Sequence, residues 1–261
     1  MGRLGIQGVR EMTQRPVLLV TGGSRGIGAA VCRLAARQGW NVAVNYAANR
    51  AAADAVVSEV KAEGGDAIAI KGDVGSAPDI VSMFRAVDRH FGRLDGLVNN
   101  AGIVDSQQRV DEMSVGRVER MMRINVTGSI LCAAEAVRRM SSRHGGKGGA
   151  IVNISSMAAV LGSASQYVDY AASKAAIDTF TVGLSREVAN EGVRVNAIRP
   201  GVIDTDIHAS GGLPNRARDL APSIPMQRPG TAEEIADAVL YLLSPTASYI
   251  TGAILNVSGG R

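Results

Sequence analysis

The chain has 261 residues, of which 46% are hydrophobic and 20% are charged, and its formal net charge is +4. This composition excludes a chain that is disordered along most of its length, because disorder requires low hydrophobicity together with high net charge. No run approaches about 18 apolar residues, aromatic residues make up 3%, and like charges do not cluster. We therefore expect neither a membrane nor a nucleic-acid partner.

The first 15 residues show no periodic pattern, and their apolar side chains stand isolated. We predict a flexible N-terminal extension there and one folded domain over residues 16–261. Cys32 and Cys132 lie far apart in the sequence, which suits neither a disulfide framework nor a zinc site, and the three histidines lack ligand spacing. The sequence therefore predicts no metal site and a reducing, cytoplasmic location.

Short apolar strands alternate with helical patterns along the domain. Strands are predicted at residues 17–20, 41–45, 67–71, 97–99, 150–154, 193–198 and 253–257. Helices are predicted at residues 27–38, 49–63, 78–91, 114–143 and 168–190, with a last one opening at a Thr231–Glu234 capping box. Seven buried strands alternating with helices predict an α/β fold: a Rossmann-type, doubly wound parallel sheet with helices on both faces.

A glycine-rich turn, Thr-Gly-Gly-Ser-Arg-Gly-Ile-Gly, joins the first strand to the first helix at residues 21–28. Glycine lets the backbone turn sharply and approach a phosphate, while a helix N-terminus offers free N–H groups and a partial positive charge. The glycine spacing differs from the G-x-G-x-x-G dinucleotide fingerprint. The strand–turn–helix setting nevertheless predicts a phosphate-binding site.

Tyr170 and Lys174 stand four residues apart on one predicted helix, which places a phenol and an ammonium on the same face. A phenol with a pKa near 10 is a poor acid–base at neutral pH, and a nearby cation favours its phenolate form. Lowering that pKa by about 3 units requires roughly 4 kcal/mol. Ser155 and Ser156 follow a strand, at the sheet edge where α/β proteins bind ligands.

Taken together, these motifs closely resemble the classical short-chain dehydrogenase/reductase family, with 3-oxoacyl-carrier-protein-reductase-like and glucose-1-dehydrogenase-like members most similar. The resemblance spans nearly the whole chain and includes Asn-Asn-Ala-Gly at 99–102, Asn125 in Arg-Ile-Asn-Val-Thr-Gly, Asn-Ile-Ser-Ser at 153–156, Tyr-Ala-Ala-Ser-Lys at 170–174 and Arg-Pro-Gly at 199–201. It implies an oxidoreductase that transfers hydride between NADP(H) and a carbonyl or secondary alcohol.

The resemblance also implies a role for each matching residue. Tyr170 would be the general acid–base, and Lys174 would lower its pKa and bind the nicotinamide ribose. Ser156 would donate to the substrate oxygen, and Asn125 would hold a water that links Lys174 to solvent. The cofactor would lie against Gly22, Ser24, Arg25, Gly26, Ile27, Gly28, Asn45, Tyr46, Asp73, Val74, Asn100, Ala101, Gly102, Tyr170, Lys174, Pro200, Gly201, Ile203 and Thr205.

The serine position departs from the family pattern. The family commonly places serine thirteen residues before the tyrosine, where this chain has Met157. We infer a one-residue insertion within residues 162–169, which makes Ser156 the counterpart and leaves Ser155 as the alternative. Tyr167 is a second candidate for the acid–base, but no lysine follows it four residues later.

The cofactor preference follows from the end of the second strand. NAD(H) binding uses an acidic side chain there to hold the ribose 2′-hydroxyl, whereas this strand ends in Asn45-Tyr46. Arg25 lies in the glycine-rich turn and Arg50 follows, so the sequence predicts NADP(H), with NAD(H) use left open. An NAD(H)-using or dual-cofactor sugar or polyol dehydrogenase is the alternative. A catalytically idle NADP(H)-binding regulator is a rival of another class.

The loop after the Arg-Pro-Gly motif and the two long helices predict substrate binding and assembly. Residues 202–228 are too long for a simple connection and predict a substrate lid, in which Thr205 would meet the nicotinamide amide by resemblance. His208, Arg216 and Arg218 are candidates to bind a polar or anionic substrate tail, or are solvated surface groups. Relatives of this kind pair the helices at 114–143 and 168–190, so we expect a homotetramer. Small residues on the second helix suit that pairing or burial against the chain's own sheet: Ala172, Ala175, Ala176 and Thr179.

Overall fold

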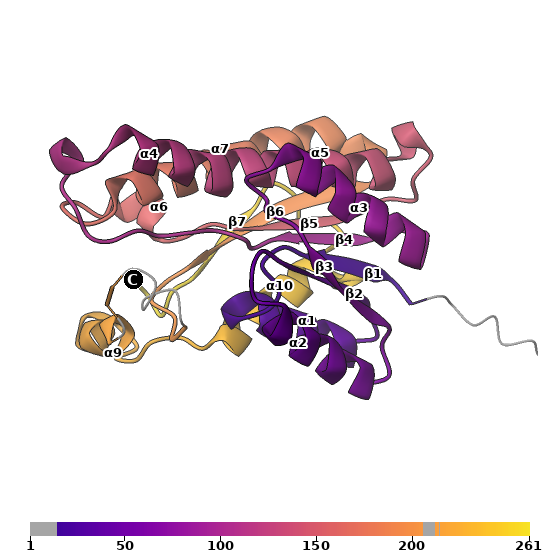
Figure 1. Ribbon diagram of the computed structural model, residues 1–261, viewed down its shortest axis with the longest axis horizontal. Coiled ribbons are helices and arrows are strands. Elements are labelled where there is room, and N and C mark those ends of the chain that lie inside the picture. The colour runs from indigo at the N-terminus through magenta and orange to yellow at the C-terminus, as the bar shows by residue number, and fades with distance from the viewer. Residues whose placement is uncertain (1–14, 206–211, 214) are drawn as a thin grey trace, which may run out of the picture.

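The computed structural model describes residues 15–205, 212–213 and 215–261. The predicted N-terminal extension lies outside the described residues except for Arg15, and so does His208. The described chain forms a seven-stranded sheet flanked by helices on both faces (Figure 1). This is the predicted Rossmann-type architecture.

All six strand pairings are parallel, in the order β3-β2-β1-β4-β5-β6-β7. The strands are β1 (Val17–Val20), β2 (Asn41–Tyr46), β3 (Ala67–Lys71), β4 (Gly96–Asn99), β5 (Gly149–Ile154), β6 (Val193–Pro200) and β7 (Ile254–Val257). The chain moves outward from β1 to β3 and then returns to add β4 on the other side of β1. This reversal opens a crevice at the carboxyl ends of the strands, where such sheets bind ligands.

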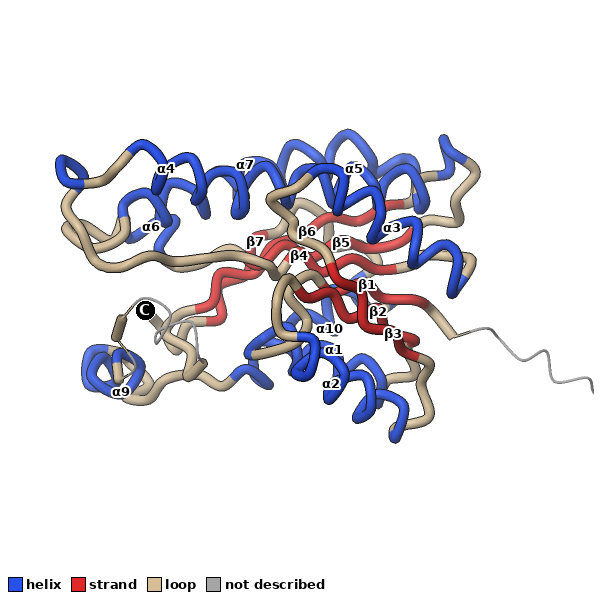
Figure 2. Tube along the Cα trace, viewed as in Figure 1, coloured by secondary structure: helices blue, strands red, loops and turns tan. Residues whose placement is uncertain are grey.

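The helices form two layers, which Figures 1 and 2 show above and below the sheet. One layer contains α1 (Gly26–Arg37), α2 (Arg50–Ala62) and α10 (Ala232–Leu243). The other contains α3 (Ala77–Phe91), α4 (Val115–Met122), α5 (Ser129–Met140) and α7 (Val168–Val188). Alternate residues of β1 serve the two cores: Leu18 and Val20 pack with the first layer, and Val17 and Leu19 with the second. This alternation follows from the period of two along a strand.

The helix predicted at residues 114–143 is interrupted. A π-helical turn, Arg123–Gly128, joins α4 to α5. Asn125 lies in this turn, and its side chain exchanges two hydrogen bonds with the backbone of Ile103, at 2.8 and 3.0 Å. Such π-turns are rare and concentrate at functional sites. This one places the Asn125 amide beside the loop that follows β4.

The long loop after β6 contains regular structure that its Pro and Gly content did not predict. It holds a short helix, α9 (Arg216–Leu220), and a 3₁₀ turn, Ala221–Ser223. Val202, Ala217 and Ile224 form a small buried cluster with Leu220 packed against it. The described part of the loop therefore has an apolar core of its own.

Candidate functional site

The glycine-rich turn lies between β1 and α1 at the carboxyl edge of the sheet. Gly26 adopts a φ of +52°, and a Cβ there would lie 3.6 Å from Thr205 of the long loop. A Cβ at Gly28 would fall 2.4 Å from the Gly22 carbonyl oxygen and 2.6 Å from Asn100 Nδ2. The close path of this turn therefore requires glycine at residue 28.

The N-terminus of α1 is open toward a ligand. Arg25 makes no side-chain cap there, and the first turn carries no acidic residue. The first backbone N–H groups of a helix lack partners within the helix, so they and the helix dipole favour an anion. The buried Asn45 amide braces the turn from below by accepting from Gly22 N at 3.0 Å. A phosphate-bearing cofactor fits this arrangement.

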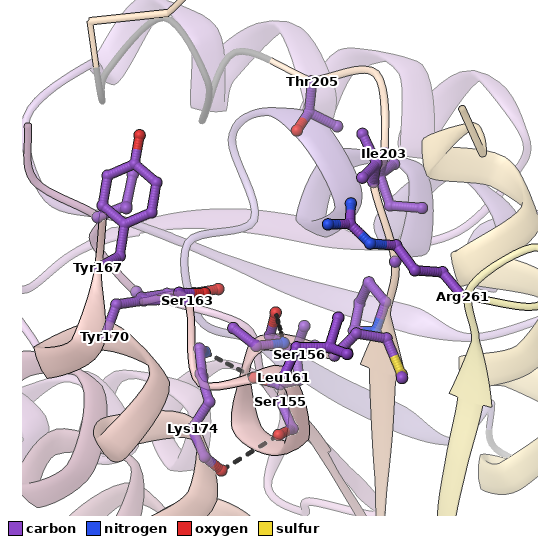
Figure 3. Close-up of a pocket in the computed structure, with 18 of the residues that line it drawn as sticks. Ser155, Ser156, Leu161, Ser163, Tyr167, Tyr170, Lys174, Ile203, Thr205 and Arg261 are labelled. Carbon is purple, nitrogen blue, oxygen red and sulfur yellow. Dashed lines mark hydrogen bonds between the residues drawn. The ribbon is translucent and has the colours of Figure 1, made fainter. Parts of the chain in front are cut away.

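A cavity of about 290 Å³ lies next to this turn, beside the ends of β5 and β6 (Figure 3). Residues from both halves of the chain line it. The predicted site residues among them are Ile27, Asn100, Gly102, Ser156, Tyr170, Lys174, Pro200, Gly201, Ile203 and Thr205. The topology thus brings the proposed acid–base and the glycine-rich turn to one opening.

The other predicted site residues lie around the cavity, outside its lining. Gly22, Ser24, Arg25, Gly26 and Gly28 form the turn; Asn45, Tyr46, Asp73, Val74 and Ala101 occupy the ends of β2, β3 and β4; and Asn125 lies in the π-turn. The Asn45 amide is fully used within the fold, since Nδ2 donates to the carbonyls of Ile70 and Gly72 at 3.3 and 3.0 Å. Its contribution is to hold the turn.

Tyr170 is partly buried near the N-terminal end of α7. Desolvation raises the pKa of its phenol, and a hydrogen bond from the Ser156 hydroxyl opposes this by lowering it. The sequence predicted a lowered pKa through Lys174; the net direction here is upward because burial disfavours the phenolate. Tyr170 is therefore a protonated phenol at neutral pH, which is the form that donates a proton.

The two serines after β5 have different surroundings. Ser155 is buried, and its Oγ donates to the Lys174 carbonyl at 3.2 Å. Ser156 lines the cavity, where its Oγ accepts from Ala158 N at 3.1 Å and interacts with the Tyr170 phenol. The geometry favours Ser156 as the hydroxyl that meets a substrate.

Lys174 is 5% exposed, and its ammonium lies 5.6 Å from the centre of the Tyr170 ring. Its Nζ donates to the Ile154 carbonyl at 2.8 Å. Burial lowers the pKa of Lys174 to about 8, while the Asp178 carboxylate acts in the opposite direction. Asp178 is held by Arg199 Nε at 2.9 Å. The Asp178 carboxylate, which stabilises the charged form of the buried Lys174, is therefore itself already paired with Arg199.

Asn125 links the loop after β4 to α7. It is 1% exposed, and its Nδ2 also lies 3.1 Å from Ser173 Oγ. A Cβ at Gly102 would lie 3.4 Å from Asn125 Oδ1 and 3.5 Å from Lys174 Nζ, so both polar atoms flank the same point of the loop. This convergence suits the predicted relay between Lys174 and solvent.

The lowered pKa of Lys174 predicts how carbonyl reduction depends on pH. A base whose pKa is about 8 loses its charge as the pH rises through 8, well below the usual value for lysine. We therefore expect kcat/KM for reduction to fall above about pH 8, while the raised pKa of Tyr170 keeps the phenol protonated there. A pH–rate profile from pH 6 to 10 measures this. A flat profile to pH 10 would contradict it.

Sequence reasoning missed part of the cavity lining. Val104 lies after β4, and Gln166 lies in the segment where we inferred the insertion. Tyr167 also lines the cavity, although the sequence argued against it as the acid–base. Arg261 also lines the cavity, and no motif in the sequence predicted this. The chain turns back to the cavity at Gly259 and Gly260, which both have positive φ.

Comparison with known proteins places the chain in a family. The family model described as enoyl-(acyl carrier protein) reductase matches residues 22–261. An uncharacterised oxidoreductase of Escherichia coli K12, YgfF, is 51% identical over 245 residues, which are 94% of this chain and 99% of that protein. A 3-oxoacyl-[acyl-carrier-protein] reductase of Synechocystis is 40% identical over 94% of this chain and 96% of that protein. The chain belongs to the classical short-chain dehydrogenase/reductase family.

Solved members of the short-chain dehydrogenase/reductase family share the whole fold. A variant of the Serratia marcescens enzyme superposes with a TM-score of 0.86 at 38% identity, covering 95% of this chain and 98% of that one. A Burkholderia cenocepacia short-chain dehydrogenase in complex with NADP superposes with the same TM-score at 33% identity, covering 95% and 97%. The protein is therefore an NAD(P)-dependent oxidoreductase.

Among the described residues, no group of three or more His, Cys, Asp or Glu side chains is arranged to hold a metal ion. No helix in the described part of the chain is long and apolar enough to cross a membrane. The cytoplasmic location stays a prediction.

Proposed function

We propose that this short-chain dehydrogenase/reductase transfers hydride between NADP(H) and a carbonyl or secondary alcohol, with Tyr170 as the general acid–base. The observation that carries the proposal is the single cavity where Tyr170, Ser156 and Lys174 lie next to Thr205 and the glycine-rich turn. The cavity gives a carbonyl group access to two hydroxyls, and Ile27 and Thr205, which would lie against the cofactor, line the same space.

The proposed mechanism follows from the charges that develop. When bound, the nicotinamide supplies or accepts the hydride. The hydroxyls of Ser156 and Tyr170 bind the substrate oxygen, where negative charge grows during reduction. Tyr170 then donates its proton to that oxygen. The Lys174 ammonium stabilises the resulting phenolate, and Asn125 supports the path by which the proton is restored.

The same structure supports a preference for NADP(H). The glycine-rich turn and the N-terminus of α1 would hold the pyrophosphate, and Thr205 and Lys174 would lie toward the nicotinamide end. Arg25 is exposed in the turn, whose Gly23 N donates to the Asn45 carbonyl of β2 at 2.8 Å, and no carboxylate ends that strand. Arg50 pairs with Asp54 at 3.2 Å, so Arg25 is the freer guanidinium for a 2′-phosphate.

The NADP(H) preference predicts a ratio of rates. We expect kcat/KM for NADPH to exceed that for NADH, and Arg25→Gln to lower the NADPH value about tenfold while changing the NADH value little, because one charge-assisted contact is lost. Steady-state kinetics with both cofactors measure this. Arg85→Gln, which removes the same charge from the opposite helix layer, is the control. A higher value with NADH for the unmodified protein would overturn the preference.

We also propose that the enzyme is a homotetramer. On α7, Ala172 and Thr179 are exposed to solvent in the single chain, which supports pairing with a partner helix over burial against the chain's own sheet. A second surface surrounds the edge strand β7, where Leu255 is exposed and Tyr249 lies nearby, fully exposed. Two such surfaces suit a tetramer with two kinds of two-fold interface.

Light scattering at micromolar concentration tests the assembly. We expect a mass about four times the 27.1 kDa of one chain. A mass of one chain would contradict the tetramer. A dimer would mean that one of the two surfaces stays free.

A further inference from the structure

The charged side chains that line the cavity within the described part of the chain all carry positive charge. Among the described lining residues these are Lys174, Arg216 and Arg261, and no Asp or Glu lines the cavity there. Lys174 is already committed to Ile154 and Tyr170. The guanidinium groups of Arg216 and Arg261 take no part in the proposed proton transfer, so their charges are available to bind a ligand.

Arg216 is held in place at the cavity by the segment before Tyr170. It opens α9, and its Nη2 donates to Gln166 Oε1 at 2.8 Å. Its guanidinium also lies 5.2 Å from the centre of the Tyr167 ring. A guanidinium carries five N–H donors in a rigid plane, and stacking on an aromatic ring leaves the edge of that plane available. Arg216 is thus oriented without being neutralised.

Arg261 reaches the cavity from the opposite side. The turn before it passes through Gly259 and Gly260, with φ of +64° and +92°, and packs against Ile224 and Pro225 of the long loop. Gly259 O accepts from Met226 N at 3.1 Å, and Ser258 Oγ donates to the Arg261 carbonyl at 3.0 Å. These contacts fix the backbone of Arg261 beside α9 (Figure 1).

The Arg261 side chain points into the cavity. Figure 3 shows its guanidinium projecting toward the space that Tyr167 and Tyr170 face from the other side. It forms no ion pair with any carboxylate of the described chain, whereas Arg33, Arg117 and Arg199 each pair with a carboxylate. An arginine next to a partly enclosed cavity is stabilised by an anion, and a carboxylate or phosphate matches its planar donors.

We propose that the substrate is a carbonyl compound that carries an anionic group, a carboxylate or a phosphate, and that Arg216 and Arg261 bind this group. The inference rests on the proposed function, because it names the substrate class of the same cavity. The carbonyl lies at Ser156 and Tyr170, and the anionic group lies in the part of the cavity that Arg216 and Arg261 line from opposite sides. Specificity is then set by charge at the far end of the substrate.

Matched pairs of ketones test the substrate class. Oxoalkanoates of increasing chain length are compared with their methyl esters, and 3-acetylphenyl phosphate is compared with 3-methoxyacetophenone, each with NADPH and with NADH. We expect kcat/KM for the anion to exceed that for its neutral partner about tenfold or more at one chain length or for the phosphate. The two arms show which anion is preferred. Equal or higher values for every neutral partner would overturn the inference and leave the proposed function intact.

Variants assign the preference to residues. Arg216→Gln and Arg261→Gln should each reduce the anion-to-neutral ratio about tenfold. Arg218→Gln, exposed on the same helix and outside the cavity lining, should leave the ratio unchanged. An unchanged ratio in both variants would overturn the inference. A raised KM for NADPH with an unchanged ratio in Arg261→Gln would do so too, because that guanidinium would then serve the cofactor.

Binding of the preferred anion is measured apart from turnover. Calorimetry with the Tyr170→Phe protein saturated with NADP⁺ should show binding that Arg261→Gln weakens about tenfold, and no such loss with Arg218→Gln. If the unmodified protein reduces none of the acids, phosphates and esters, that result would instead contradict the proposed function, and with it this inference.

Discussion

Replacing Tyr170 with Phe should lower kcat for carbonyl reduction about a thousandfold or more, because the change removes the hydroxyl that we propose as the proton donor. The ring remains, so the cavity and its contact with the Lys174 ammonium, 5.6 Å from the ring centre, should be preserved. The glycine-rich turn is untouched, and we expect the Kd for NADPH to change less than about threefold. Steady-state kinetics and calorimetry measure the two quantities.

Tyr167→Phe is the matched comparison for Tyr170→Phe. Tyr167 lines the same cavity three residues earlier, but its ring lies under Arg216 and no lysine follows it at the helical spacing. We expect Tyr167→Phe to lower kcat by less than about tenfold. A loss in Tyr167→Phe that matches the loss in Tyr170→Phe, or wild-type rates in Tyr170→Phe, would show that the acid–base is wrongly assigned.

Gly28→Ala should raise the Kd for NADPH about a hundredfold or more. The new Cβ would lie 2.4 Å from the Gly22 carbonyl oxygen, and this neighbour is backbone, so the turn itself must move. Moving it withdraws backbone N–H groups from the proposed phosphate site, and the loss of two charge-assisted hydrogen bonds at about 1.5–3 kcal/mol each accounts for the weaker binding. Calorimetric titration with NADPH measures it.

Gly116→Ala is the control for Gly28→Ala. Gly116 lies in α4, and a Cβ there would meet nothing within 4 Å. Alanine should therefore raise the free energy of unfolding by about 0.5–1 kcal/mol through helix propensity, with NADPH binding unchanged. Gly28→Ala protein that binds NADPH as tightly as this control would contradict the role given to the turn.

The sheet was predictable because its information is local. Four apolar residues at 17–20, a glycine-rich turn and a helical period place β1 and α1 from the sequence alone, and parallel strands need no partner-specific pattern beyond burial on both faces. The capping box of α10 was read in the same way, since Thr231 and Glu234 bond each other's backbone groups at 2.9 and 3.2 Å.

Features made by distant contacts were not predictable. The π-turn at Asn125 depends on hydrogen bonds to Ile103, which lies 22 residues away, so no pattern within residues 114–143 indicates it. The helix α9 depends on the burial of Ala217 against Val202 and Ile224. Arg261 enters the cavity through the turn at Gly259 and Gly260, which no pattern in the sequence connects with Tyr170.

The central claim is hydride transfer to a carbonyl at the Tyr170 cavity, and isotope transfer tests it most directly. Purified protein is incubated with NADPH deuterated at the nicotinamide C4 position that donates hydride and with the preferred ketone, and the alcohol is analysed by mass spectrometry. We predict one deuterium on the carbinol carbon of the alcohol, and no labelled alcohol from the Tyr170→Phe protein within the same time. Alcohol without deuterium, or equal labelling by the Tyr170→Phe protein, would contradict the account.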